Sequence, residues 1–321
     1  MTSSPETAAP APARARRMPD FFIVGHHKSG TTALYEMLRS HPQIYMPDLK
    51  EPLFFARELH PGLQAEHPQP DTLDEYLDLF AAAQPGQLTG EASPSYLRSQ
   101  SAAGRIAELA PGARIIAILR EPASFLRSMH LELLKDHEES EKDFAKAIAR
   151  ERRERDSKPV LWYSPERVRY TEQLRRYHDA FGADQVLVLI YDDFRADNDA
   201  TIRRVLRFLQ LDESLPTARS EANRTVLVRS PRAQASLRSL YLGHGPAARV
   251  LKPAIKALTS QRLRRHGIHA VRRRVLYGEP TEPDHELMLE LRRSFKPEVQ
   301  ALSEYLDRDM VGLWGYDEVD G

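Results

Sequence analysis

The stretch FFIVGHHKSGTTALYEML, Phe21 to Leu38, decides the fold class of this 321-residue chain. Four apolar residues lead into a polar loop between Gly25 and Gly30, and an amphipathic helix pattern follows. The glycines have the spacing of the phosphate-binding loop G-x-x-x-x-G-K-[ST], but the lysine is Lys28, inside the loop, and Thr31 takes the usual lysine position. A strand, a glycine-flanked turn and a helix start present backbone N–H groups, so the stretch predicts an anion site.

Hydroxyl and ammonium groups around the loop favour anion binding over a plain strand-to-helix turn. Thr31 and Thr32 offer hydroxyl groups in the first helical turn, and Lys28 adds a positive charge. Gly25 and Gly30 allow the backbone to approach a ligand closely. Glycines alone would favour the plain turn, so the interpretation depends on the polar residues between and after them.

Three unbroken apolar runs organise the rest of the chain: Phe21–Val24, Ile115–Leu119 and Val186–Ile190. None alternates polar and apolar residues, which is typical of strands buried on both faces of a parallel sheet. Each run leads into a helical pattern of apolar residues. The sequence therefore predicts an α/β, three-layer, P-loop-like fold with a central parallel β-sheet flanked by helices.

Composition narrows the class of protein. The 46 basic and 46 acidic residues cancel, which disfavours a nucleic-acid partner, and the absence of cysteine excludes disulfides and thiolate chemistry. We expect a disordered tail over 1–18, without the apolar core of a secretory signal, and one domain over 19–316. Within it, 232–282 is an uncertain helical segment that serves as scaffold or faces the acceptor. No apolar run is long enough to span a bilayer, so we expect a cytoplasmic protein.

The loop resembles that of a known family, the sulfotransferases that use 3′-phosphoadenylyl sulfate (PAPS). GHHKSGTTAL is similar to their 5′-phosphosulfate loop, which has a lysine inside the loop and G-T-T at the helix start. The resemblance implies that PAPS is the sulfuryl donor. It further implies that Lys28 contacts the oxygen between phosphorus and sulfur, and that the donor is bound by the residues Lys28, Ser29, Gly30, Thr31 and Thr32.

A second segment, RIIAILREPASFLRSMHLEL, supports the same resemblance. Arg120 ends the second apolar run and Ser128 follows on the next predicted helix, where the family binds the 3′-phosphate. Arginine makes bidentate contacts to phosphate oxygens, and a hydroxyl group can add another hydrogen bond. The alternative is an ion pair of Arg120 with Glu121 and a serine without a role. Arg229, in EANRTVLVRSPR, is a further expected phosphate contact in this resemblance.

The resemblance also suggests the residue that accepts the acceptor's proton. The heparan-modifying branch of the family uses a glutamate just before two aromatic residues, and DLKEPLFFA has that form, so Glu51 is the expected base. The alternative is an exposed Lys50–Glu51 charge pair. Glu91 is the second choice. Four histidines are further candidates: His26, His27, His60 and His130.

The predicted reaction is direct in-line transfer to a hydroxyl or amine, with adenosine 3′,5′-bisphosphate as co-product and without a metal. Two alternatives remain open. A P-loop kinase using ATP and Mg²⁺ would use Thr31 or Thr32 with Asp192 as metal ligands, and a catalytically silent protein would only bind nucleotide. The acceptor is a small molecule, glycan, glycolipid or other natural product, and peripheral membrane contact stays open.

Overall fold

The computed structural model describes residues 17–59, 69–136, 138–157, 161–214, 227–228, 277–278 and 284–319. The expected tail before Arg17, His60, Arg229 and nearly all of the segment 232–282 lie outside the described residues. Contacts divide the chain into two compact units. The first comprises Met1–Arg120 and Glu172–Ala222, and the second Glu121–Thr171 and Asn223–Gly321. The single domain expected over 19–316 stays a prediction.

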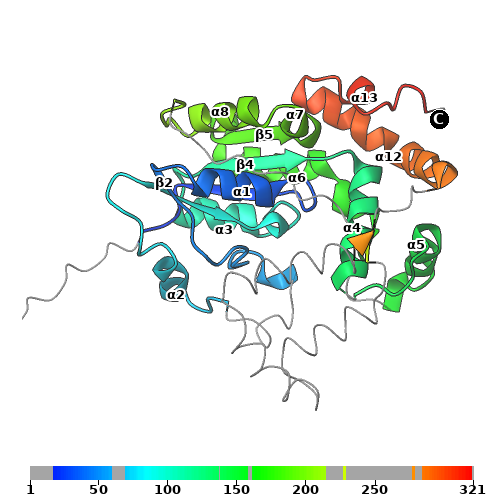
Figure 1. The fold of residues 1–321 in the computed structure, drawn as a ribbon, viewed down its shortest axis with the longest axis horizontal. Helices are drawn as coiled ribbons and strands as arrows, with labels where there is room; N and C mark the ends of the chain where they lie inside the picture. The colour runs from blue at the N-terminus through cyan, green and yellow to red at the C-terminus, as the bar shows by residue number, and fades with distance from the viewer. Residues whose placement is uncertain are drawn as a thin grey trace, which may run out of the picture. The chain divides into compact units, whose positions relative to one another are not determined.

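The first unit contains a five-stranded sheet in the order β2-β3-β1-β4-β5, and every neighbouring pair is parallel (Figure 1). The strands are β1 (Phe21–Gly25), β2 (Ile44–Tyr45), β3 (Leu88–Ala92), β4 (Arg114–Leu119) and β5 (Val186–Ile190). The three apolar runs form β1, β4 and β5, the three adjacent strands on one side of β3. The predicted parallel α/β fold is confirmed.

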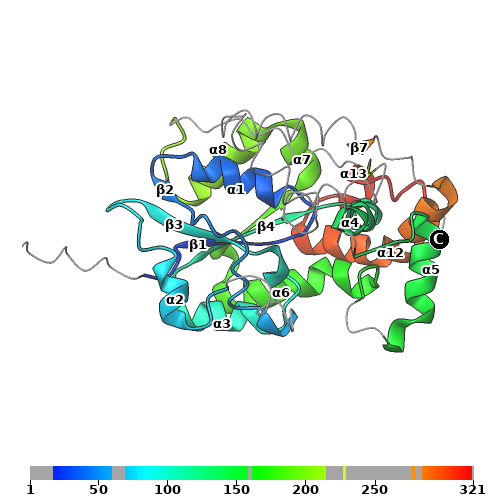
Figure 2. The same ribbon diagram turned by 60° about the horizontal axis from the view of Figure 1, so that its bottom comes forward.

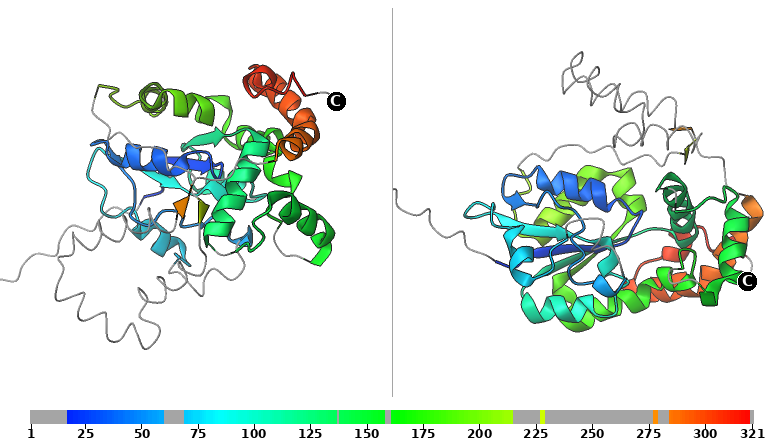
Figure 3. Two further views of the ribbon diagram at one scale, coloured as in Figure 1. Left: turned by 45° about the vertical axis from the view of Figure 1, so that its right-hand side comes forward. Right: turned by 90° about the horizontal axis from the view of Figure 1, so that it is seen from below.

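Helices cover both faces of this sheet. On one face lie α1 (Thr31–Arg39) and α8 (Asn198–Phe208); on the other lie α3 (Ala102–Leu109) and α6 (Tyr170–Phe181), most of which belongs to this unit (Figure 2; Figure 3, right). Residues Phe21–Val24 are 0% exposed as a result. Burial on both sides is the reason why this strand has no alternation of polar and apolar residues.

The first unit also contains two short helices and a 3₁₀ turn. Helix α2 (Leu73–Asp78) begins with a capping box, in which Thr72 accepts from the Glu75 amide and Glu75 accepts from the Thr72 amide. Helix α7 (Tyr191–Ala196) begins directly where β5 ends. A 3₁₀ turn, Pro94–Tyr96, follows β3. The turn after β3 and helix α7 place polar residues next to the carboxyl ends of β3 and β5.

The second unit is mainly helical. Its described elements are α4 (Pro122–Asp136), α5 (Phe144–Arg153), α12 (His285–Leu306), α13 (Met310–Leu313) and the antiparallel pair β6 (Leu227–Val228) and β7 (Tyr277–Gly278). Helix α12 packs against α4. The start of α4 is held by Glu121, whose carboxylate accepts from the Ala123 and Ser124 amides and from the Tyr316 hydroxyl. The C-terminal segment thus fixes the beginning of α4.

Candidate active site at the carboxyl edge of the sheet

The glycine-flanked loop joins β1 to α1. Gly30 caps the helix at φ 92°, without any side-chain acceptor for the first amides, and the Leu34 amide is the first to bond back, to the Gly30 carbonyl at 3.0 Å. The helix amides before Leu34 therefore have no intrahelical acceptor. A Cβ at Gly30 would lie 3.0 Å from the Phe194 ring, so glycine is required by both conformation and space. The amino end of α1 offers N–H donors to an anion, as the sequence predicts.

Gly25 is needed for a different reason. A Cβ there would lie 2.5 Å from the Cβ of Leu97, and the Leu97 amide donates to the Val24 carbonyl at 2.7 Å. The segment that follows β3 can therefore run close to the loop only because residue 25 has no side chain. The loop and the end of β3 are packed together at one edge of the sheet.

Arg120, directly after β4, also reaches the loop. Its Nη1 donates to the Lys28 carbonyl at 2.9 Å, and its guanidinium lies 4.8 Å from the centre of the Tyr191 ring. Lys28 itself has φ 58°, a conformation that non-glycine residues rarely adopt. The ends of β1, β4 and β5 thus meet through these three residues. No role is predicted from the sequence for Tyr191, which stands directly before Asp192 in the motif YDDF.

Three of the four candidate histidines are described, and each lies within hydrogen-bonding distance of a neighbouring group. His26 is 1% exposed, its amide donates to the Ile118 carbonyl, and its Nδ1 lies 3.2 Å from the His27 carbonyl oxygen. His27 Nε2 lies 3.4 Å from the Ser95 hydroxyl. In the second unit, His130 contacts the Tyr163 hydroxyl at 2.8 Å, and burial lowers the pKa of the imidazole. His26 and His27 both belong to the loop, and His27 contacts the segment after β3.

Glu51 lies at the same edge of the sheet, because its amide donates to the carbonyl of Ala92, the last residue of β3, at 3.1 Å. Its side chain is 36% exposed and pairs with the Lys50 ammonium group. The backbone here is strained, since Glu51 has φ 62° and Leu53 has φ 55°. Each such conformation costs on the order of 1–3 kcal/mol and persists only where neighbouring contacts enforce it.

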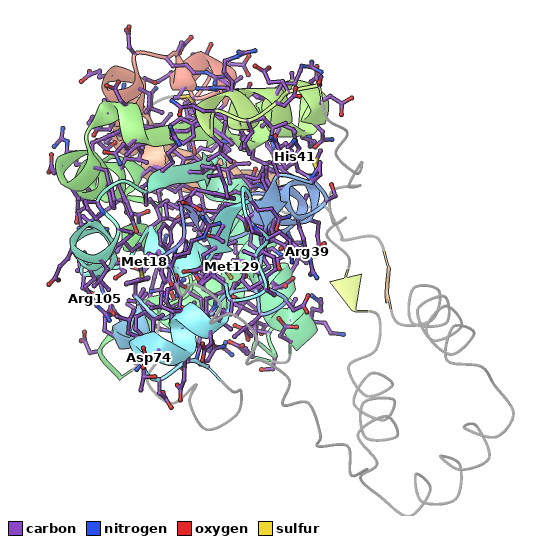
Figure 4. The ribbon with its side chains drawn as sticks, turned by 90° about the vertical axis from the view of Figure 1, so that its left-hand side faces the viewer. Met18, Arg39, His41, Asp74, Arg105 and Met129 are labelled. Carbon is purple, nitrogen blue, oxygen red and sulfur yellow. The ribbon has the colours of Figure 1, made fainter. Side chains whose placement is uncertain are left out.

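Aromatic packing supplies part of that enforcement. Phe54 stacks on Tyr76 with ring centres 4.6 Å apart, and Phe55 meets the edges of Tyr76 and Tyr96 at 5.3 and 5.7 Å. The Arg105 guanidinium lies 5.7 and 5.6 Å from the two phenylalanine ring centres; Arg105 is labelled in Figure 4. The motif of a glutamate before two aromatic residues therefore has a physical reason. The aromatic pair anchors the loop, and the glutamate stays at its edge.

Glu91, in β3, lies inside this aromatic cluster. It is 0% exposed, and its Oε2 accepts from the Tyr76 hydroxyl at 2.6 Å and the Tyr96 hydroxyl at 3.1 Å. Burial raises the pKa of Glu91 to about 7, although the two phenol hydrogen bonds act in the opposite direction. The structure therefore separates the two glutamates proposed as base. Glu51 is accessible to an acceptor, whereas Glu91 is enclosed.

Ser128, in α4 of the second unit, is 3% exposed, and its hydroxyl has no hydrogen-bond partner among the described residues. An unsatisfied buried hydroxyl costs about 1–3 kcal/mol. A bound phosphate oxygen would supply the missing partner, so this residue fits the role that the sequence predicts for it.

Neither a group of metal ligands nor a membrane-spanning helix occurs among the described residues. In the ranges that the structure describes, no three His, Asp or Glu side chains are grouped as metal ligands. None of the described helices is long and apolar enough to cross a bilayer. The expectations about metal use and location stay predictions.

The fold and the site are those of an α/β protein that binds an anionic ligand at the carboxyl edge of its sheet. A parallel α/β sheet carries a glycine-flanked loop, an arginine and an aromatic residue at the carboxyl ends of adjacent strands, which is where such sheets bind ligands. A profile described as "Sulfotransferase family" matches residues 19–214. The chain belongs to the sulfotransferase family, as its loop predicts.

Individual relatives agree with this assignment. Mouse heparan sulfate glucosamine 3-O-sulfotransferase 3B1 is 34% identical over 112 residues, which are 35% of this chain and 26% of that protein. Human carbohydrate sulfotransferase 15 is 27% identical over 280 residues, 69% of this chain and 48% of that protein. The chain thus spans between about a quarter and a half of these relatives.

A solved structure, the sulfotransferase from Alicyclobacillus acidocaldarius, matches with a TM-score of 0.68 and 26% identity. The match covers 92% of this chain and 98% of that one. The similarity extends over nearly the whole of a solved bacterial sulfotransferase.

Proposed function

We propose that this protein transfers a sulfuryl group from PAPS to a hydroxyl or amine of an acceptor and releases adenosine 3′,5′-bisphosphate. The observation that carries the proposal is the β1–α1 loop. Its lysine lies inside the loop and its helix start is capped only by Gly30, in a chain of the sulfotransferase family. The amides at this helix start and the Lys28 ammonium suit a phosphosulfate group.

The donor is held, in this proposal, at its two anionic ends. The loop residues bind the phosphosulfate: Lys28, Ser29, Gly30, Thr31 and Thr32. Arg120 and Ser128 bind the 3′-phosphate, with Arg229 as a third contact from outside the described residues. The buried, unsatisfied hydroxyl of Ser128 and the position of Arg120 beside the loop support these roles.

Glu51 accepts the proton of the acceptor as the new bond to sulfur forms. At the same time, the bond between sulfur and the phosphate oxygen breaks, and negative charge grows on that oxygen. Lys28 and the α1 amides stabilise this charge, which is the electrostatic contribution common in group transfer. The proposal requires no metal, because the chain itself supplies positive charge where the leaving group develops.

The acceptor class that we propose is carbohydrate. The named relatives are a heparan sulfate glucosamine sulfotransferase and a carbohydrate sulfotransferase. Phe54 is close in sequence to Glu51. The guanidinium groups of Arg105 and Arg57 lie over the Phe54 ring, at 5.7 and 4.9 Å from its centre. Cationic groups there would favour an acidic glycan over a neutral one.

The test has two stages. Adenosine 3′,5′-bisphosphate should raise the melting temperature in the presence of a chelator, and labelled sulfate should move from PAPS to heparan sulfate oligosaccharides more readily than to neutral oligosaccharides. Stabilisation by ATP with Mg²⁺ but not by the bisphosphate would favour the kinase alternative. Stabilisation by the bisphosphate without transfer to any acceptor in a broad panel would favour the silent binding protein.

A further inference from the structure

Glu91 is connected to the loop that carries Glu51 through the Tyr96 phenol and also through the Ser93 hydroxyl, which accepts the Leu53 amide. The Tyr96 hydroxyl donates to Glu91 Oε2 at 3.1 Å and accepts the Phe55 amide at 3.3 Å. A hydroxyl group that donates to a carboxylate becomes a better acceptor, because hydrogen bonds in a chain polarise one another. The charge on Glu91 therefore strengthens the bond that Tyr96 makes to the backbone of Phe55.

Two more bonds join the same strand end to the same loop. The Leu53 amide donates to the Ser93 hydroxyl at 3.3 Å, and the Glu51 amide donates to the Ala92 carbonyl at 3.1 Å. Every second residue of the loop, from Glu51 to Phe55, is thus tied to the segment that follows Glu91. Such ties are what the left-handed conformations of Glu51 and Leu53 require.

We propose that Glu91 is a positioning residue for sulfuryl transfer: its carboxylate holds Tyr96, Tyr96 holds the Phe55 backbone, and the loop then presents Glu51 to the acceptor. This inference rests on the proposed function, in which Glu51 is the base. A buried carboxylate is a costly way to accept two phenol hydrogen bonds, since a neutral amide could accept them without burying a charge. In this proposal the ionised carboxylate acts on the loop through Tyr96 and is not a source of stability.

The groups that face Glu91 determine how activity depends on pH. They are Ser93 and Tyr96 after β3, Tyr76 from α2, Tyr177 from α6, and Glu51 from the loop, whose carboxylate is paired with the Lys50 ammonium group. The Ser93 hydroxyl does not titrate in this range. Burial raises the pKa of all three phenols well above their usual range, so they stay neutral. Burial raises the pKa of Glu91 to about 7, and kcat should rise as pH rises through this value because Glu91 becomes ionised.

The test compares Glu91→Gln and Tyr96→Phe with Tyr76→Phe. Tyr76→Phe is the matched control, because it removes the other phenol donor to Glu91 Oε2 but no bond to the 51–55 backbone. With heparan sulfate oligosaccharide as acceptor, we expect kcat to fall about tenfold in the first two variants, the scale of one hydrogen bond. The KM for PAPS should not change, and Tyr76→Phe should lose much less.

Two results would be specific to positioning. The increase in kcat near pH 7 should disappear in Glu91→Gln, and adding Tyr96→Phe to that variant should lower kcat little further. Equal losses in all three variants would overturn the proposal, because they would indicate general damage to the aromatic cluster. An unchanged kcat and pH profile in Glu91→Gln would overturn it as well.

A readout independent of turnover separates this inference from the proposed function. Hydrogen exchange of the Phe55 amide should be faster in Glu91→Gln and Tyr96→Phe than in the wild type, and unchanged in Tyr76→Phe. If the wild type transfers no sulfuryl group, the proposed function fails, while the exchange at Phe55 still decides whether Glu91 holds the loop. Unchanged exchange in both variants would overturn the positioning role.

Discussion

Arg120 donates a hydrogen bond from Nη1 to the backbone carbonyl of Lys28 at 2.9 Å, which couples the end of β4 to the loop after β1. Two residues that we assign to opposite ends of the donor are therefore part of one hydrogen-bonded structure. The Arg120 guanidinium also lies over the Tyr191 ring, so the end of β5 joins the same cluster. A substitution of Arg120 should therefore alter the conformation of the loop as well as the binding of the 3′-phosphate.

Arg120→Ala should weaken binding of adenosine 3′,5′-bisphosphate about 10- to 100-fold. It removes a charged partner of a phosphate, worth about 1.5–3 kcal/mol, together with the bond to the Lys28 carbonyl. Titration calorimetry measures the effect. Arg114→Ala is the matched control, because Arg114 begins the same strand at its opposite end. Equal losses in the two variants would contradict the assignment.

Gly30→Ala should lower the free energy of unfolding by about 1–3 kcal/mol and weaken bisphosphate binding. The residue has φ 92°, and a Cβ would lie 3.0 Å from the Phe194 ring. Gly86→Ala is the control, since Gly86 has φ 85° but nothing within 4 Å of its Cβ position. It should show a smaller loss of stability and no loss of affinity. Unaltered binding in Gly30→Ala would show that the loop conformation does not matter to the donor.

Glu51→Gln should lower kcat by on the order of a hundredfold or more, the usual effect of losing a general base, and leave bisphosphate binding nearly intact. Steady-state kinetics and calorimetry on the same preparation check both statements. Glu36→Gln, at an exposed position on α1, provides the control. Near-normal turnover of Glu51→Gln would move the role of base away from Glu51, and His27 in the loop would be the next candidate.

Ser128→Ala should leave the melting temperature unchanged or slightly raised, because the buried hydroxyl has no hydrogen-bond partner among the described residues. Its affinity for the bisphosphate should fall several-fold, about 1 kcal/mol for one hydrogen bond. Ser124→Ala, on the same helix, is the control. A marked loss of stability without a loss of affinity would make Ser128 a structural residue.

Stability should depend on pH through Glu91. Burial raises its pKa from 4.5 to about 7, so the folded protein binds the proton more tightly than the unfolded chain does. The free energy of unfolding should therefore fall as pH rises from 4.5 to 7, by about 3 kcal/mol at most. Urea denaturation at several pH values should show this contribution in the wild type and not in Glu91→Gln. Parallel curves for the two proteins would contradict the shift.

The strands illustrate what a sequence pattern can and cannot predict. Residues Phe21–Val24 are enclosed on both faces, and their unbroken apolar run predicts a buried strand. Strand β3 has the sequence LTGEA, and because it contains polar residues it is not recognised as an unbroken apolar run. Strand β2 has only two residues. Glu91 is 0% exposed in β3, and its Oε2 accepts from the hydroxyl of Tyr76, 15 positions earlier in the chain. Periodicity contains no information about that partner.

The sequence by itself determined the family, the loop and the parallel α/β fold, because these depend on residues that are close together in the chain. Gly25, Lys28 and Gly30 lie within six positions, and their spacing dictates the turn. Only the tertiary structure decided which of the two glutamates is exposed. The exposure of Glu51 and the enclosure of Glu91 depend on contacts such as that between Phe55 and Tyr96, 41 positions apart. Burial and hydrogen-bond partners at such separations arise only when the chain is folded.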